Sequence, residues 1–196
     1  MKMQLFRSTA AAMITVVAFV LCPSAHASTR STAGTPWDAL QEQLNEGGTV
    51  TLTNDVTAAD GDAMLTVTNA VTLDLNGHTI AFNGSKEVFH VGTGGDLTLT
   101  NGLAAGAVTG GGDHGVYIGS NAVFRLQGGV IAGNTSGYGG GGVFVNAFGT
   151  FEMSGGAITN NAVYDGDNAG GGVYVVKDGS FTRGSSATIP RLSWTT

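Results

Sequence analysis

The sequence predicts an all-β protein in which short parallel strands wind into about five stacked coils, a β-solenoid with a short capping helix at its N-terminal end. The first observation is self-similarity, because the stretch VFVNAFGTFEMSGGAI that begins at Val143 closely resembles VYIGSNAVFRLQGGVI, which begins at Val116. Looser copies begin at Leu65, Phe89 and Val173, so the unit recurs every 24 to 30 residues. The second observation is that apolar residues alternate within each copy, which is the period of strands. The third is the presence of 33 glycines among 196 residues without a collagen triplet, which is typical of a turn-rich structure.

The copies are expected to stack, because two short strands cannot bury an apolar face alone. Inward positions then form columns at fixed offsets. The first column contains Leu65, Phe89, Val116, Val143 and Val173; the second, two residues later, contains Val67, Val91, Ile118, Val145 and Val175; the third, eight residues after the first, contains Leu73, Leu97, Phe124, Phe151 and Phe181.

Asparagine recurs eighteen residues after the first inward position, at Asn83, Asn134 and Asn161. An asparagine repeated at one turn is expected to bond to the backbone and side-chain amides of the neighbouring coils. The copy at Phe89 has Ala107 at this offset, so its turn is expected to differ.

Residues 1–27 have the pattern of a secretory signal peptide, with basic residues near the start, the apolar run Ala10–Leu21 and a small-residue site ending at Ala27. The run is shorter than the roughly 20 residues that span a bilayer. We therefore expect Sec-type export with cleavage after Ala27, and a secreted or cell-surface location without a membrane span in the mature chain. Cys22 raises the alternative of a lipoprotein, which Leu21 before it disfavours. An exported chain without a later cysteine suits a bacterial surface.

Residues 28–34 are expected to be a flexible lead-in, and residues 35–48 a capping helix. Thr35 is the predicted N-cap, Pro36 suits the first helical turn, and a glycine pair at the end predicts the stop. The apolar face contains Trp37, Leu40 and Leu44. We expect this helix to cover the first coil, because open strand edges invite pairing with another chain. An interaction helix is the alternative.

The regular solenoid is expected to cover residues 49–182, and residues 183–196 are expected to be irregular. Arg183 falls at an inward offset that earlier copies fill with Leu75, Leu99, Leu126 and Met153. A buried unpaired charge is costly. We therefore expect a truncated or frame-shifted member of a longer protein, with an exposed C-terminal edge that self-associates.

The stretch VTLDLNGHTI (residues 71–80), followed by coils such as GGGVYV (residues 170–175), resembles the right-handed parallel β-helix of the pectin-lyase-like superfamily. In particular it resembles the glycine-rich repeats of bacterial secreted, adhesin-like surface proteins. The likeness covers about residues 37 to 182 and implies a surface-associated structural or binding module for a glycan or a protein. The superfamily also includes polysaccharide lyases and glycosidases. An enzyme of this kind, or a catalytically dead remnant of one, is therefore the alternative.

Catalysis in this superfamily requires a cluster of acids, or acids with a basic residue, on one outward face. The outward column nine residues after the first inward position contains Asp74, Thr98, Arg125, Glu152 and Thr182. It holds no pair of adjacent acids, and Arg125 beside Glu152 is expected to form a surface ion pair. We assign no catalytic residue.

One loop is a weak candidate for a calcium site, and it contains Asp165, Asp167 and Asn168. Acids at alternate positions followed by glycine resemble a calcium loop, but Ala169 and Val176 stand where further ligands are expected. A solvated turn is the favoured alternative, so no cofactor is expected. The histidines His78, His90 and His114 share no spacing of a metal site and are taken as surface residues.

An outward aromatic column is the candidate binding surface. One residue after the first inward position it contains, after Thr66, the four residues His90, Tyr117, Phe144 and Tyr174. Such a column is expected to present a flat platform to sugar rings or to a protein. The alternative is that neighbouring rings only stabilise each other. The net charge of −6 does not suggest a nucleic-acid partner.

Overall fold

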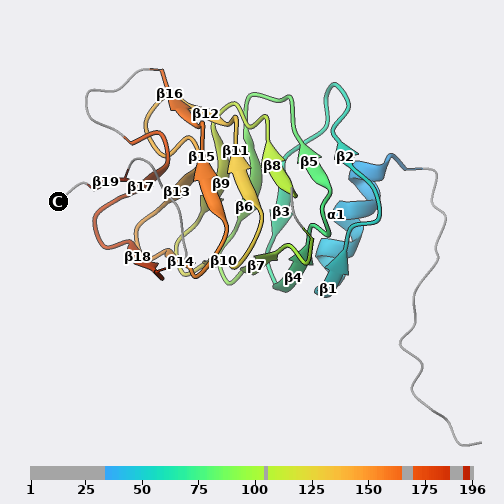
Figure 1. Ribbon diagram of the computed structural model, residues 1–196, viewed down its shortest axis with the longest axis horizontal. Helices are drawn as coiled ribbons and strands as arrows, with labels where there is room; N and C mark the ends of the chain where they lie inside the picture. Colours follow the sequence, from blue (N-terminus) through green and yellow to red (C-terminus); the bar gives the residue numbers. More distant parts are fainter. Residues whose placement is uncertain (1–33, 104–105, 165–169, 186–191, 195–196) are drawn as a thin grey trace, which may run out of the picture. The chain divides into compact units, whose positions relative to one another are not determined.

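The computed structural model describes residues 34–103, 106–164, 170–185 and 192–194. In these ranges the chain forms one helix, α1 (Pro36–Glu46), and a succession of short strands that wind into coils (Figure 1). The expected signal peptide, nearly all of the lead-in and the loop with Asp165, Asp167 and Asn168 lie outside the described residues. None of the described helical residues forms a segment long and apolar enough to cross a membrane.

Each full coil contributes one strand to each of three sheets. Sheet A contains, in spatial order, β1 (Gly48–Thr51), β4 (Ala70–Asp74), β7 (Asp96–Thr100), β10 (Val123–Leu126), β14 (Thr150–Met153) and β18 (Ser180–Arg183). Sheet B contains β2 (Val56–Thr57), β5 (Thr79–Ala81), β8 (Ala107–Thr109), β11 (Val130–Ala132) and β15 (Ala157–Thr159). Sheet C contains β3 (Leu65–Val67), β6 (Glu87–Val91), β9 (His114–Ile118), β13 (Val143–Val145), β17 (Val173–Val175) and β19 (Leu192–Trp194). The small sheet D pairs β12 (Thr135–Ser136) with β16 (Ala162–Val163).

Neighbouring strands in these sheets are parallel, as in a solenoid in which each coil lies on the one before it. Figure 1 shows the equivalent strands of successive coils side by side, for example β15, β11 and β8. The predicted fold class is confirmed: a parallel β-solenoid of about five coils, preceded by one short helix.

The interior is built from the predicted columns of sheet C. Leu65 aligns with Phe89, Phe89 with Val116, and Val116 with Val143, which in turn aligns with Val173. All five side chains are fully buried. The second predicted column is likewise in register, from Val67 to Val175, so sheet C follows the sequence pattern throughout.

The third predicted column is wrong by two residues in the first full coil. Leu73 aligns with Leu99, and Leu97 aligns with Val71. The cause is turn length, because two residues join β3 to β4 whereas four join β6 to β7. An even change keeps the inward and outward alternation, so the interior stays apolar although the predicted partners change. Because of the same shift of two residues, Asp74 aligns with Thr100 and does not lie in the outward column that contains Arg125.

Helix α1 forms as the sequence predicts. Thr35 caps it through a reciprocal pair of bonds with Asp38, in which the Thr35 hydroxyl accepts from the Asp38 N–H at 3.2 Å and the Asp38 carboxylate accepts from the Thr35 N–H at 3.0 Å. The helix ends at Glu46 and is followed by the C-cap Gly47, which has a φ of 77°. Its buried residues are Trp37, Leu40 and Leu44.

The helix covers the first coil and satisfies the open edge of β3. The side chain of Gln41 accepts from the Thr66 N–H at 2.7 Å and donates to the Thr66 carbonyl at 2.9 Å, so it replaces a neighbouring strand at this position. Trp37 donates to the Ala63 carbonyl at 2.8 Å and stacks on Phe82 with ring centroids 5.4 Å apart.

Two of the three predicted asparagines join neighbouring coils. Asn134 is fully buried, and its side-chain oxygen accepts from the Gly111 N–H at 2.9 Å while its amide donates to the Val108 carbonyl at 3.2 Å. Asn161 accepts from the Asn134 N–H at 3.0 Å and donates to the Ile131 carbonyl at 2.8 Å.

The other two predictions for this column are corrected by the structure. Asn83 is exposed and lies outside the ladder of Asn134 and Asn161. Ala107 belongs to β8 and aligns with Val130, so it is not the counterpart of the asparagines. Gly111 is the counterpart of Asn134 in the preceding coil, because the Gly111 carbonyl accepts from the N–H of Thr135, the residue that follows Asn134.

The C-terminal coil differs from the sequence expectation in two ways. Arg183 aligns with the buried Met153, but its side chain is exposed, so the strand continues through this position without burying the cation. Strand β19 aligns with β17, so sheet C continues one strand past the expected end of regular structure at residue 182.

Candidate functional site

The four aromatic residues named from the sequence lie in one line along the outer face of sheet C. His90 is on β6, Tyr117 on β9, Phe144 on β13 and Tyr174 on β17, and each aligns with the next. They come together because they occupy the same outward position on parallel strands in register. We call this set the aromatic ladder.

The rings of the aromatic ladder are stacked on one another. Ring centroids are 4.9 Å apart for His90 and Tyr117, 5.5 Å for Tyr117 and Phe144, and 5.5 Å for Phe144 and Tyr174. The interplanar angles are 17°, 6° and 23°. Because the ring faces cover one another, the ladder presents ring edges and polar atoms to solvent. Any flat platform that the ladder presents is therefore built of ring edges rather than of ring faces.

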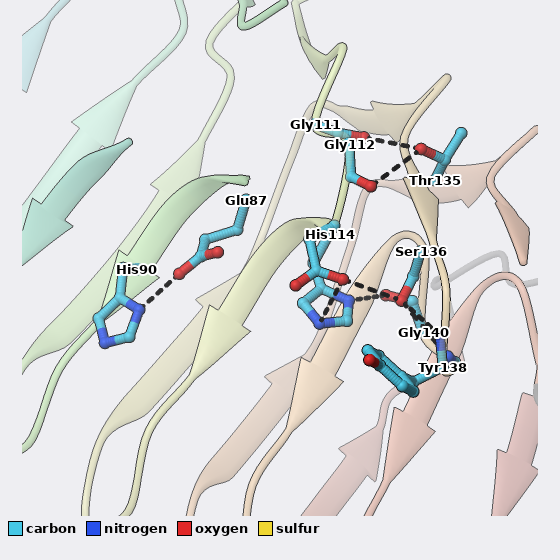
Figure 2. A network of polar contacts seen from close by, with 11 residues as sticks. Glu87, His90, Gly111, Gly112, His114, Thr135, Ser136, Tyr138 and Gly140 are labelled. Carbon is cyan, nitrogen blue, oxygen red and sulfur yellow. Dashed lines mark hydrogen bonds and ion pairs between the residues drawn. The ribbon is translucent and has the colours of Figure 1, made fainter. Parts of the chain in front are cut away.

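Polar neighbours hold the ladder in place. The amide of Asn146 donates to the Tyr117 hydroxyl oxygen at 2.8 Å, which leaves the hydroxyl proton free to donate outward. Nδ1 of His90 lies 2.6 Å from the carboxylate of Glu87, a residue that is only 6% exposed. Figure 2 shows Glu87 turned toward the ring of His90.

His114 packs behind the ladder and corrects the expectation that it is a surface residue. It is 4% exposed, and its ring lies 4.9 Å from that of Phe144 and 6.1 Å from that of Tyr117. Its Nδ1 lies 3.0 Å from the carbonyl of Gly140 (Figure 2), which can only accept, so Nδ1 carries the proton. Burial lowers the pKa of His114, and the neighbouring carboxylate of Asp113 opposes this shift.

Register alone did not predict this buried pair. Glu87 and His114 each stand two residues before the first inward position of their copies, and the structure aligns them on adjacent strands. Strict alternation would turn both inward, but Val88 and Phe89 are both fully buried, so the alternation breaks there and Glu87 and His114 lie on the side of the ladder, against His90 and Phe144. In the next coil this place belongs to a glycine, Gly141, whose added Cβ would lie 2.4 Å from a backbone oxygen of the neighbouring turn.

Arg125 lies on sheet A between two carboxylates. Its Nε is 3.0 Å from Glu152, which confirms the predicted ion pair, and its Nη1 also bonds to Asp96. The hydrogen bond that Arg125 donates to Asp96 is the main reason why the pKa of Arg125 is raised. A guanidinium held in this way is a poor proton acceptor, so it is not suited to act as the base that a polysaccharide lyase needs.

The remaining acids and histidines of interest have structural partners. His78 lies 3.3 Å from Asp55, whose carboxylate also accepts from the Thr79 N–H at 2.9 Å, and that bond is the main cause of a lowered pKa of Asp55. Asp74 accepts from the N–H groups of Asn76 and Gly102 at 2.9 and 3.0 Å. Among the described residues, no group of three or more histidine, cysteine or acidic side chains could hold a metal ion.

Comparisons with protein-family models, with curated proteins and with solved structures find no match for this chain.

Proposed function

We propose that this chain is an exported, surface-associated solenoid that binds an extended neutral polysaccharide along the aromatic ladder. The observation that carries the proposal is the spacing of the rings, 4.9 to 5.5 Å from one to the next. This spacing is close to the advance of one sugar residue in an extended β-linked glycan. A glycan that runs parallel to the coil axis would therefore meet one ring edge per sugar residue.

The chemistry of the ring edges fits hydroxyl-rich ligands. Tyr117 and Tyr174 carry phenol groups and His90 an imidazole, which both donate and accept hydrogen bonds. Each such bond contributes little alone, so affinity is expected to grow with the number of sugar residues that are engaged together. The stacked rings are already ordered, which reduces the entropy lost on binding.

Charge favours a neutral glycan over a polyuronate. The chain has a net charge of −6, and Glu87 and Asp113 lie beside the ladder. An acidic surface repels a polyanion at low ionic strength. The proposal agrees with the adhesin-like surface module that the pectin-lyase-like resemblance implies, and it places recognition on sheet C.

The test is calorimetric titration with cellohexaose, chitohexaose and polygalacturonate. We expect at least one neutral hexasaccharide to bind, more tightly than its trisaccharide, and polygalacturonate to bind weakly or not at all. The double variant Tyr117→Ser, Tyr174→Ser should lose at least about tenfold in affinity, which corresponds to about 1.4 kcal/mol.

Two further variants separate recognition from packing. Tyr164 is 77% exposed and is not part of the ladder, so Tyr164→Ser is the matched control and should bind as the parent does. The variant Tyr117→Phe, Tyr174→Phe keeps the stack but removes the hydroxyl groups, and should lose part of the affinity, with a loss of unfolding free energy of no more than about 1 kcal/mol from the missing bond to Asn146. Parental affinity in the serine double variant, or no binding of either hexasaccharide by the parent, would refute the proposal.

A further inference from the structure

The turns that lead from sheet C to sheet A carry a column of residues with positive φ. The third residue of the turn has φ values of 81° at Gly94, 58° at Asn121, 61° at Phe148 and 66° at Asp178. Backbone bonds join the column from coil to coil, because Asn121 donates to the Phe148 carbonyl at 3.1 Å and Phe148 donates to that of Asp178 at 3.0 Å. The stack of coils therefore imposes the same conformation on each turn.

Phe148 is the unusual member of this column. Glycine, asparagine and aspartate are the residues that adopt positive φ with least strain, and they occupy the other three places. A phenylalanine is strained there, and burial does not compensate, because 63% of its surface is exposed. A strained and exposed aromatic side chain indicates a role outside folding.

We infer that Phe148, together with Asn121 and Asp178, forms a contact site for a single sugar residue. The three side chains leave backbones of similar positive φ, 58° to 66°, on successive coils about 4.8 Å apart, so we expect them to point in the same direction. An aromatic ring offers a surface for the apolar face of a pyranose, while the flanking amide and carboxylate match its hydroxyl groups. With 63% of its surface exposed, the ring of Phe148 cannot be covered on both faces.

The geometry connects this site to the aromatic ladder. Asn146, which begins the turn of Phe148, is the residue that donates to the Tyr117 hydroxyl at 2.8 Å. On the far side of Asn121 the column continues with Gly94, where an added Cβ would meet nothing within 4 Å, so space is open there for a ligand. The inference depends on the proposed function for its ligand class and adds a contact that the ladder does not supply.

The experiment is a titration of ¹⁵N-labelled protein with cellohexaose and with methyl β-D-glucopyranoside, followed by amide chemical shifts. We expect both sugars to shift the amides of Asn121, Phe148 and Asp178. The variant Phe148→Asn should lose these shifts. Because asparagine is preferred at positive φ, this variant should unfold at the same or a higher urea concentration than the parent. Leu103 is 60% exposed elsewhere on the surface, so Leu103→Asn is the matched control and should keep the shifts.

The outcomes separate this inference from the proposed function. Shifts at the ladder amides without shifts at the turn overturn the inference and leave the proposed function standing. Shifts at the turn without shifts at the ladder support the inference and contradict binding along the ladder. Retained turn shifts in Phe148→Asn, or a lower unfolding midpoint of that variant, assign Phe148 to the fold and overturn the inference. Binding of neither sugar contradicts both.

Discussion

Single residues decide how firmly one coil is attached to the next. The buried side chain of Asn134 accepts from the Gly111 N–H on one side, and its N–H groups bond to the side chain of Asn161 on the other. A buried polar group that loses its partner costs far more free energy than an average hydrogen bond contributes. The asparagine ladder therefore contributes to stability through the groups it satisfies.

We predict that Asn134→Ala lowers the free energy of unfolding by about 3 kcal/mol, because it leaves buried backbone groups without partners. The control is Asn83→Ala, since Asn83 has the same offset in the sequence but is exposed. That change should cost less than about 0.5 kcal/mol. Urea unfolding of both variants measures the difference, and equal effects would contradict the role given to Asn134.

His114 makes the stability of the fold depend on pH. Its pKa is lowered in the folded state, mainly by burial, so the folded chain binds a proton less readily than the unfolded chain does. The stabilisation is therefore fully present above the unfolded pKa of about 6.5 and is lost as the pH falls below it toward the folded pKa.

We predict that His114→Phe reduces the loss of unfolding free energy between about pH 7.5 and about pH 5, since the group that resists protonation is absent. The control is Leu103→Phe, because Leu103 is 60% exposed and its replacement leaves every ionisable group in place. That control should keep the parental pH dependence. Urea unfolding at the two pH values tests this, and an identical pH dependence in His114→Phe and the parent would contradict the assignment.

The sequence predicted most of what single residues do on sheet C, because alternation determines which side chains point inward or outward. It could not predict that His114 is buried, because the packing of its ring against Phe144 and its bond to Gly140 involve another coil. It also could not predict the orientation of the ladder rings, since side-chain torsions are set by the neighbouring rings rather than by register.

At the level of elements, helix α1 acts as a substitute strand. Gln41 gives the Thr66 backbone the two hydrogen bonds that another coil would supply. The sequence predicted the helix and its buried face from capping and periodicity, but not this contact. In the sequence, a glutamine that bonds to a neighbouring strand looks the same as a glutamine that is exposed to solvent.

We predict that Gln41→Ala lowers the free energy of unfolding by about 1 to 2 kcal/mol and speeds hydrogen exchange of the Thr66 amide, because both backbone groups lose their partner. Glu42→Ala, one position along the same helix at an exposed residue, should change stability by less than about 0.5 kcal/mol. Exchange measured by NMR provides the test. Unchanged protection of Thr66 in Gln41→Ala would show that the helix does not cap this edge.

Turn lengths are the other feature of the elements that the sequence left open. The join between β3 and β4 is two residues shorter than the equivalent join in the next coil. An even difference does not disturb the alternation, so counting from the start of each copy aligned Leu73 with Leu97, although Leu73 lies beside Leu99. Only the observed pairing of β4 with β7 shows which residues are neighbours.

At the scale of the whole molecule, the structure is a column of coils that share one apolar interior. Each coil contacts only its neighbours, so the surfaces that we propose for binding are lines that run along the column. The aromatic ladder and the turn column with Phe148 are both such lines. Their existence depends on register, since a slip of one residue would turn the ladder rings into the core.

Ring-to-ring nuclear Overhauser effects in the free protein test this register most directly. We expect cross peaks between Tyr117 and Phe144 and between Phe144 and Tyr174, whose ring centroids are 5.5 Å apart in each case. We expect none between Tyr117 and Tyr174, which lie two coils apart. A direct cross peak between the two tyrosines, or the absence of both expected contacts, would contradict the stacked order of the coils and both surfaces built on it.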